Sequence, residues 1–199
     1  MHMTIHRFRH RPEEAVEDFL GAVEPLLFED DQPAGTCVLG RLDGPEGAVL
    51  AFWPAETAAT AAATWSAGQP PWLDARAYAV TGGGPGRAAG STARLAFTGW
   101  FDTAGDSARA EAADRAGRER IDPVVRVQDG VVAAYGLRAA DDTVGFLVLG
   151  TDVTVPEKVR RAALRTTLLP GEDPALLSGP DRVDLHRVLS VRLPEAVRS

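Results

Sequence analysis

The chain has 199 residues, of which 45% are hydrophobic and 25% are charged, a balance typical of globular proteins with one large core or two small ones. Its formal net charge is −7 and its basic residues are scattered, so we expect neither nucleic acid nor an anionic membrane surface as a partner. The sequence has no apolar run of about 18 residues and no signal-like N-terminal core, and its single cysteine, Cys37, suits a reducing compartment; we therefore expect a cytoplasmic protein without a transmembrane segment.

Six elements are predicted in the first half of the chain, two of them strands of a hairpin. Alternating residue patterns mark the strands, apolar residues at helical spacing mark the first helix, and the polar turn LDGPEG joins two apolar runs into a hairpin. An Ala-rich stretch predicts a second helix that packs closely against its neighbours. In chain order these elements are a strand over residues 4–10, a helix between Pro12 and Pro25, a hairpin over residues 38–53, a helix over residues 56–65 and a strand over residues 73–80.

A glycine-rich stretch, TGGGPGRAAGS, follows over residues 81–91. Five glycines and a proline disfavour regular structure, so this stretch is predicted to be a linker. It contains neither GxxxxGK[ST] nor a GxGxxG that opens a helix, which argues against a phosphate-binding loop. The predicted organisation is a first domain over residues 1–81, a linker over residues 82–92 and a second domain over residues 93–199.

The second half repeats the order of the first. Its hairpin, residues 134–149, aligns with the first hairpin at a constant offset of 96, which places Leu50 on Phe146 and Phe52 on Val148. The first strands align at an offset of 90 and the last strands at 110, so we infer two copies of one β-α-β-β-α-β unit. The other predicted elements are a strand over residues 94–101, a helix over residues 107–120, a helix from the capping box Thr154-x-x-Glu157 to Leu169 and a strand over residues 183–190.

The order of elements in each unit predicts an α+β fold of the ferredoxin-like type. In this fold a four-stranded antiparallel sheet carries both helices on one face. The bare face of such a sheet needs cover. Two tandem units can provide it by packing sheet to sheet, which forms an intramolecular α/β barrel with the helices outside. A linker of roughly 11 residues reaches up to about 35 Å and permits this arrangement within one chain.

This order of elements resembles the dimeric α/β-barrel superfamily, and within it the antibiotic biosynthesis monooxygenase-like proteins, in a tandem form that carries both halves of the usual homodimer. The resemblance covers nearly the whole chain and depends on element order and hydrophobic pattern. It implies a pocket between sheet and helices in each half that takes a flat apolar molecule. Some members oxygenate aromatic polyketide intermediates without flavin, haem or metal, whereas others bind or rearrange small molecules by different chemistry.

Aromatic residues crowd the first half of the chain. Core packing explains any one of them, but stacking and apolar burial would also suit a polycyclic aromatic ligand. Trp65 is the strongest single candidate, because its neighbours are small and a tryptophan lines the site at this place in the resembling oxygenases. The candidate substrate-binding residues are Trp53, Trp65, Trp72, Tyr78 and Trp100.

The candidate catalytic residues are His6, His10 and Arg76. A neutral histidine can remove a proton from a phenol, and Arg76, on one strand face with Tyr78, could stabilise the resulting anion. Solvated histidines and an Arg76 paired with a nearby carboxylate are the alternatives. His6 and His10 are about 13 Å apart along a strand and cannot share a metal ion. The sequence has no HxH, HExxH or Cys/His cluster, so we expect no metal site and no other cofactor.

The function predicted from these residues and from the resemblance is a cofactor-independent monooxygenase. It would act on an aromatic polyketide-like phenol in antibiotic biosynthesis, with this small aromatic substrate and O₂ as its only partners. Two alternatives stay open: a cyclase, isomerase or lyase that uses the same acid–base residues without oxygen, and a non-catalytic small-molecule-binding protein. A monomer and a homodimer are both compatible with the sequence. The first half, richer in Trp and His, is the expected place of the working pocket.

Overall fold

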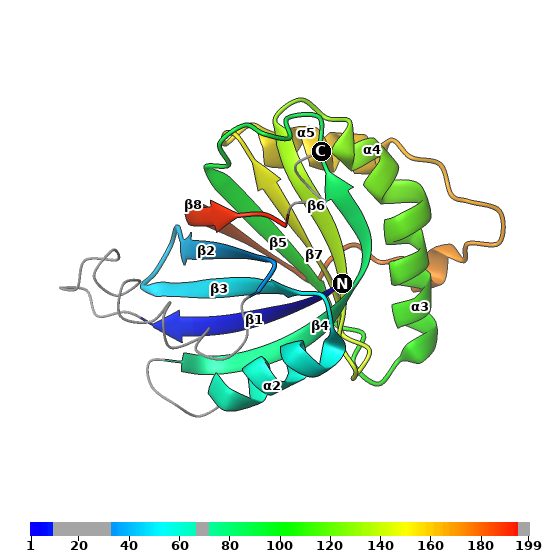
Figure 1. Cartoon of the computed structure of the whole chain (residues 1–199). Helices are drawn as coiled ribbons and strands as arrows, with labels where there is room; N and C mark the ends of the chain where they lie inside the picture. The colour runs from blue at the N-terminus through cyan, green and yellow to red at the C-terminus, as the bar shows by residue number, and fades with distance from the viewer. Residues whose placement is uncertain (10–32, 67–71, 195–199) are drawn as a thin grey trace. The chain divides into compact units, whose positions relative to one another are not determined.

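The structure is a computed structural model and describes residues 1–9, 33–66 and 72–194 (Figure 1). His10 and the helix predicted between Pro12 and Pro25 lie outside these residues. No helix of the described part has both the length and the apolar character needed to cross a membrane.

The strands are β1 (His2–Arg9), β2 (Gly35–Arg41), β3 (Glu46–Trp53), β4 (Trp72–Pro85), β5 (Leu95–Phe101), β6 (Val131–Arg138), β7 (Val144–Gly150) and β8 (Arg182–Arg192). The helices are α2 (Glu56–Ser66), α3 (Ser107–Ala116), the π-helix η1 (Gly117–Ile121), α4 (Asp122–Arg126), α5 (Val155–Leu164) and the short 3₁₀ helix η2 (Pro174–Leu176).

The chain divides into two compact units, with the boundaries between Ala79 and Val80 in β4 and between Leu185 and His186 in β8. Strand order in the first unit is β4-β1-β3-β2-β8, and in the second it is β8-β5-β7-β6-β4. Within each half, the fourth strand neighbours the first, which neighbours the third and then the second, as expected for a ferredoxin-like unit. Residues of β4 and of β8 belong to both units. The α+β class is thus confirmed, whereas the sheet-to-sheet packing of two duplicated units stays a prediction.

The core of the first unit lies on the sheet face that α2 covers. The described side chains that the helix contributes here are small, with Ala59 fully buried and Ala58 and Ala62 partly buried, as its composition predicts. Small side chains let the helix backbone approach the strands closely. The buried members of this core are Phe8, Val38, Val49, Ala51, Trp53, Ala59 and Trp72.

Gly47 in β3 leaves room for the ring of Phe8. A Cβ atom at position 47 would meet Phe8 Cζ at 2.4 Å and the carbonyl oxygen of Leu39 at 2.4 Å. The carbonyl belongs to the paired backbone of β2 and cannot rotate away, so the strands would have to separate. We expect Gly47→Ala to lower the free energy of unfolding by about 2–3 kcal/mol in urea titrations. Gly44→Ala is the matched control, because a Cβ there meets nothing within 4 Å; equal stability of the two variants would contradict this packing.

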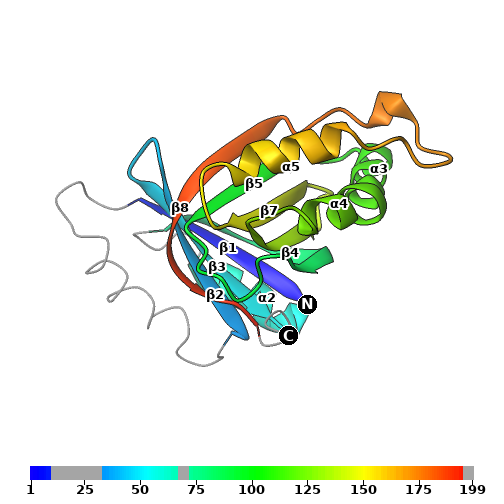
Figure 2. The same ribbon diagram turned by 90° about the horizontal axis from the view of Figure 1, so that it is seen from above.

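Helices pack on one side of the second unit's strands as well (Figure 2). Val125 of α4 and both Val155 and Val159 of α5 contact a core on β5, β6 and β7. The strand residues of this core are Phe97, Val131, Ala134 and Val148, with Phe146 and Ile121 packed against them.

The predicted register of the repeat is wrong in its third strand. Alternate residues of β3, among them Val49, pack under α2, so Leu50 and Phe52 point to the opposite face. Their predicted counterparts, Phe146 and Val148, belong to the helix-covered core of the second unit. A shift by an odd number of residues moves every side chain of a strand to its other face. The offset of 96 therefore differs from the true correspondence of the two third strands by an odd number of residues.

The first residues of the predicted linker belong to β4, which continues to Pro85. The reason is a close approach of two backbones, because a Cβ at Gly83 would lie 2.1 Å from the carbonyl oxygen of Ala134 in β6. Gly83 and Gly84 have φ angles of 111° and 146°, which glycine adopts without strain. The glycines that predicted flexibility therefore permit strand pairing, while the predicted domain boundaries themselves stay a prediction.

The second unit departs from two helix predictions. The helix expected over residues 107–120 continues through η1 and α4 to Arg126. Thr154 makes no capping hydrogen bond to the next helix, because its hydroxyl and backbone N–H both donate to Asp152, at 2.5 and 2.8 Å. The predicted capping box is therefore absent, and α5 ends at Leu164 rather than at Leu169.

Candidate functional site

A histidine lies among aromatic side chains on the α2 side of the first unit. In β1, Thr4 pairs with Ala51 and His6 pairs with Val49, and both partners belong to the core under α2. Paired residues of antiparallel strands point to the same face, so His6 faces α2 as well. We call the group of His6, Thr4, Phe8, Trp53 and Trp72 the His6 cluster; every member is buried.

Trp53 is fixed by a buried polar contact. Its indole Nε1–H donates a hydrogen bond of 3.0 Å to the hydroxyl oxygen of Thr4. This bond satisfies the one polar group of the indole and holds the ring against the strand. Sequence reasoning missed Thr4, although its position two residues before His6 on an alternating strand placed it on the same face.

A β-bulge turns Trp72 toward the cluster. Arg7 pairs with Asp74, and the next residue of β1 pairs with Trp72, so Leu73 is an extra residue in β4. Strict alternation from Asp74 would turn Trp72 to the opposite face of the sheet, and the bulge reverses this. Its ring centroid lies 5.6 Å from that of His6, with the ring planes inclined by 60°.

Burial controls the protonation of His6. Desolvation penalises the charged imidazolium and lowers the pKa of His6 from 6.5 to about 4. The side chain is therefore neutral near pH 7 and can accept a proton. It is a weak base in the closed cluster, but an anion that formed beside it would stabilise the imidazolium and raise its pKa.

Arg76 and Tyr78 lie on the other face of the sheet. Arg76 pairs with Ile5 and Tyr78 pairs with Met3, whereas His6 pairs with Ala75. Since residues 5 and 6 of one strand point to opposite faces, Arg76 cannot contact a ligand held by His6 on the α2 side. Arg76 is exposed and Tyr78 is buried. The predicted combination of a histidine base with an Arg76–Tyr78 anion site in one pocket is thus not assembled.

The remaining predicted residues lie apart from the cluster. Trp100 is half-buried in β5 of the second unit. It lies three residues after Phe97 on the same strand, so its side chain points away from the helix-covered core that contains Phe97. Trp65 lies near the end of α2, and its side chain, like His10, is outside the described residues. His186 is buried in β8, where it pairs with Arg41.

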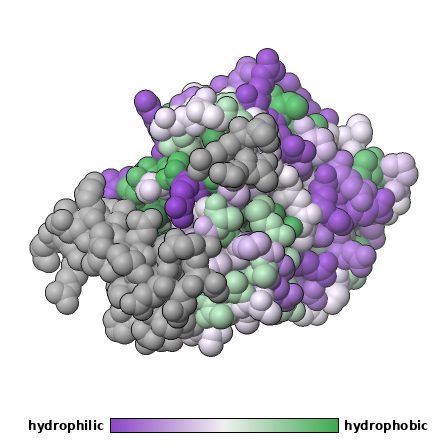
Figure 3. All heavy atoms as spheres, in the orientation of Figure 1, coloured by the Kyte–Doolittle hydropathy of each residue, from purple (hydrophilic) through white to green (hydrophobic). Residues whose placement is uncertain are grey.

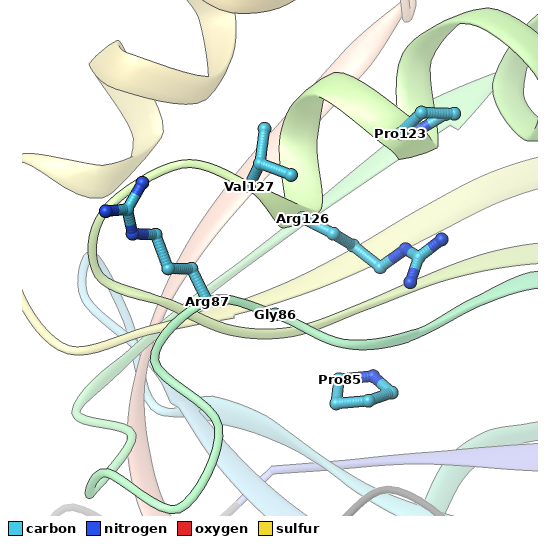
Figure 4. A pocket seen from close by; sticks show the side chains of 6 residues that line it. All are labelled: Pro85, Gly86, Arg87, Pro123, Arg126 and Val127. Carbon is cyan, nitrogen blue, oxygen red and sulfur yellow. The ribbon is translucent and has the colours of Figure 1, made fainter.

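The described residues contain no group of three or more His, Cys, Asp or Glu side chains that could hold a metal ion. A groove of about 560 Å³ lies in the second unit, lined by Pro85, Gly86, Arg87, Pro123, Arg126 and Val127 (Figure 4). Its two guanidinium groups point in different directions. Each has an acidic partner, Asp129 at 3.1 Å from Arg87 and Asp122 at 2.8 Å from Arg126. The groove therefore does not present a converging set of cations.

No protein-family model matches this sequence. No curated protein matches it either. Solved structures do resemble the chain, among them a protein from Fusobacterium nucleatum proposed to be a monooxygenase, with a TM-score of 0.68, 10% identity and coverage of 98% of this chain and 95% of that one. An anthrone oxidase-like protein has a TM-score of 0.61 and 13% identity over 96% of this chain and 92% of its own.

A third similar structure is a major regulator of staphylococcal pathogenesis, with a TM-score of 0.56, 10% identity and coverage of 94% of this chain and 98% of that one. At such identities these likenesses establish a shared fold and no more. The presence of a regulator among them means that the function has to be argued from the residues.

Proposed function

We propose that the protein is a cofactor-independent monooxygenase that acts on a flat aromatic phenol or anthrone, with His6 as the base. The observation that carries this proposal is a buried, neutral histidine whose ring lies 5.6 Å from that of Trp72 on the helix-covered face of the first unit. The fold shared with an anthrone oxidase-like protein supports the same reaction class. A role in antibiotic biosynthesis and a tandem origin of the two halves belong to this proposal.

The chemistry requires little more than a base and a dry aromatic surface. His6 takes a proton from the activated CH₂ group of the substrate, R₂CH₂. The carbanion transfers one electron to O₂, the radical pair combines, and the imidazolium returns its proton to give R₂CH–OOH. Loss of water leaves R₂C=O, so R₂CH₂ and O₂ yield R₂C=O and H₂O. The protein supplies orientation and exclusion of water, and the substrate supplies the electrons.

Access of a substrate to His6 requires α2 to move, because the cluster is buried. Among the described side chains of the helix, Ala58, Ala59 and Ala62 pack on the core that contains Phe8, Trp53 and Trp72. An alanine buries far less apolar area than a leucine, so lifting α2 costs correspondingly less. The alanine contacts described for residues 58–62 support a helix that opens for a ligand.

Oxygen consumption by metal-free, flavin-free protein with an anthrone tests the proposal. We expect uptake of one O₂ per anthrone at a rate well above that of the same solution with heat-denatured protein. Product formation under argon would instead establish the non-redox alternative. Absence of uptake with anthrone and a panel of related phenols would refute the oxygenase.

A further inference from the structure

A second groove, of about 720 Å³, runs between η1 and α4 on one side and α5 with its following loop on the other. Its volume is in the range of small-molecule sites. We call it the α4–α5 groove. It is lined by Glu119, Arg120, Pro123, Val124, Gln128, Lys158, Arg161, Ala162, Arg165, Thr166, Thr167 and Leu169. All of these residues belong to the second unit, whose surface is strongly hydrophilic on the α3 side (Figure 3).

The groove carries an excess of positive charge in a protein of net charge −7. Arg120 and Arg161 are neutralised by Glu172 at 3.0 Å and Glu157 at 2.6 Å. Lys158 and Arg165, by contrast, are exposed and form no ion pair with any described residue. The groove therefore offers two cations without a direct ion pair among the described residues, although Lys158 lies close enough to Asp152 to help lower the pKa of that carboxyl.

Its floor combines apolar and hydroxyl groups. Val124, Ala162 and Leu169 provide apolar surface and Thr167 provides a hydroxyl. The Thr166 hydroxyl is already engaged, since it donates to the carbonyl of Ala163 at 2.7 Å. A ligand with a flat apolar body and a doubly charged head would satisfy both parts. A phosphate monoester carries a charge near −2 above its second pKa of about 6, which matches two cations.

The backbone of one wall is unusual in the same place. The N–H of Asp122 bonds to the carbonyl of Gly117, an i→i+5 contact that defines the π-helix η1. Such single π-turns within helices are rare and frequent at functional sites. Glu119 and Arg120, both within η1, line the groove. Arg120 is then held by Glu172 and by a hydrogen bond of 2.9 Å to the Thr166 hydroxyl, which ties the loop after α5 to this wall.

We propose that the α4–α5 groove binds a small organic phosphate, with the phosphate between Lys158 and Arg165 and the apolar group on Val124, Ala162 and Leu169. This site lies in the second unit, apart from the His6 cluster, and does not depend on the oxygenase proposal.

Titration calorimetry with 2-naphthyl phosphate at pH 7.5 tests it. We expect Lys158→Gln and Arg165→Gln each to raise the Kd by about fivefold, because each removes one exposed charged contact. Arg94→Gln is the matched control, since Arg94 is an exposed arginine of the same unit outside the groove, and its Kd should equal that of the wild type. Inorganic phosphate and neutral 2-naphthol should both bind more weakly than 2-naphthyl phosphate. Equal effects of Arg165→Gln and Arg94→Gln, or equal binding of 2-naphthol, would overturn the site.

Discussion

Replacing His6 with glutamine should lower the rate of anthrone oxidation by about a hundredfold or more, the usual contribution of a positioned general base. Glutamine keeps a polar group of similar reach but cannot take a proton from carbon. The loss should appear in kcat, with KM little changed, because the aromatic walls of the His6 cluster remain. Oxygen-electrode rates for the wild type and the variant measure both constants.

His186→Gln is the matched control for this variant. His186 is also a buried strand histidine of the first unit, but it lies in β8 and pairs with Arg41 rather than with the cluster. We expect its kcat to stay within about threefold of the wild type. Circular dichroism melts of both variants identify any loss that comes from unfolding. A folded His6→Gln protein with wild-type kcat would remove His6 from the mechanism.

The second large effect concerns acid stability. The pKa of His6 is about 4 in the folded protein and 6.5 as the ordinary value, so between these pH values the unfolded state binds more protons. The stability contributed by the neutral histidine is complete above pH 6.5 and is lost as the pH falls toward 4. The pKa difference corresponds to about 3 kcal/mol of unfolding free energy lost between pH 7 and pH 4.

Urea titrations at pH 7, 6, 5 and 4 on the wild type and on His6→Gln separate this effect from the titration of carboxylates. Both proteins share the carboxylates, so the difference between their stabilities isolates the histidine. The wild type should lose about 3 kcal/mol more than the variant across this range. Parallel stability curves would show that His6 is not held in a desolvated environment.

Elements whose signals are local could be predicted from the sequence. Alternation placed His6 and Phe8 on one strand face, and the alanine pattern of residues 56–65 predicted a helix that packs closely; the structure has both features. The hairpins and the last strand were also found within a few residues. These patterns follow from side-chain periodicity, which a single stretch of chain fully contains.

The prediction of the site was wrong where pairing between distant strands decides which face of the sheet a side chain occupies. The face of Trp72 depends on the bulge at Leu73, which exists only in the pairing of β4 with β1. The separation of Arg76 from His6 depends on the register of the same two strands. Likewise the sequence does not reveal that η1 and α4 form the wall of a groove opposite the basic residues of α5.

The pairing of β2 with β8 has a consequence for synthesis on the ribosome. Residues 36–41 find their partners on one side only among residues 186–192, at the far end of the chain. At translation speeds of about 5–20 residues per second, that edge of the nascent first unit waits on the order of ten seconds before its partner emerges. During this interval an exposed strand edge is open to pairing with other chains, so yield in the cell should depend on how quickly translation finishes and on chaperones that shield the waiting edge.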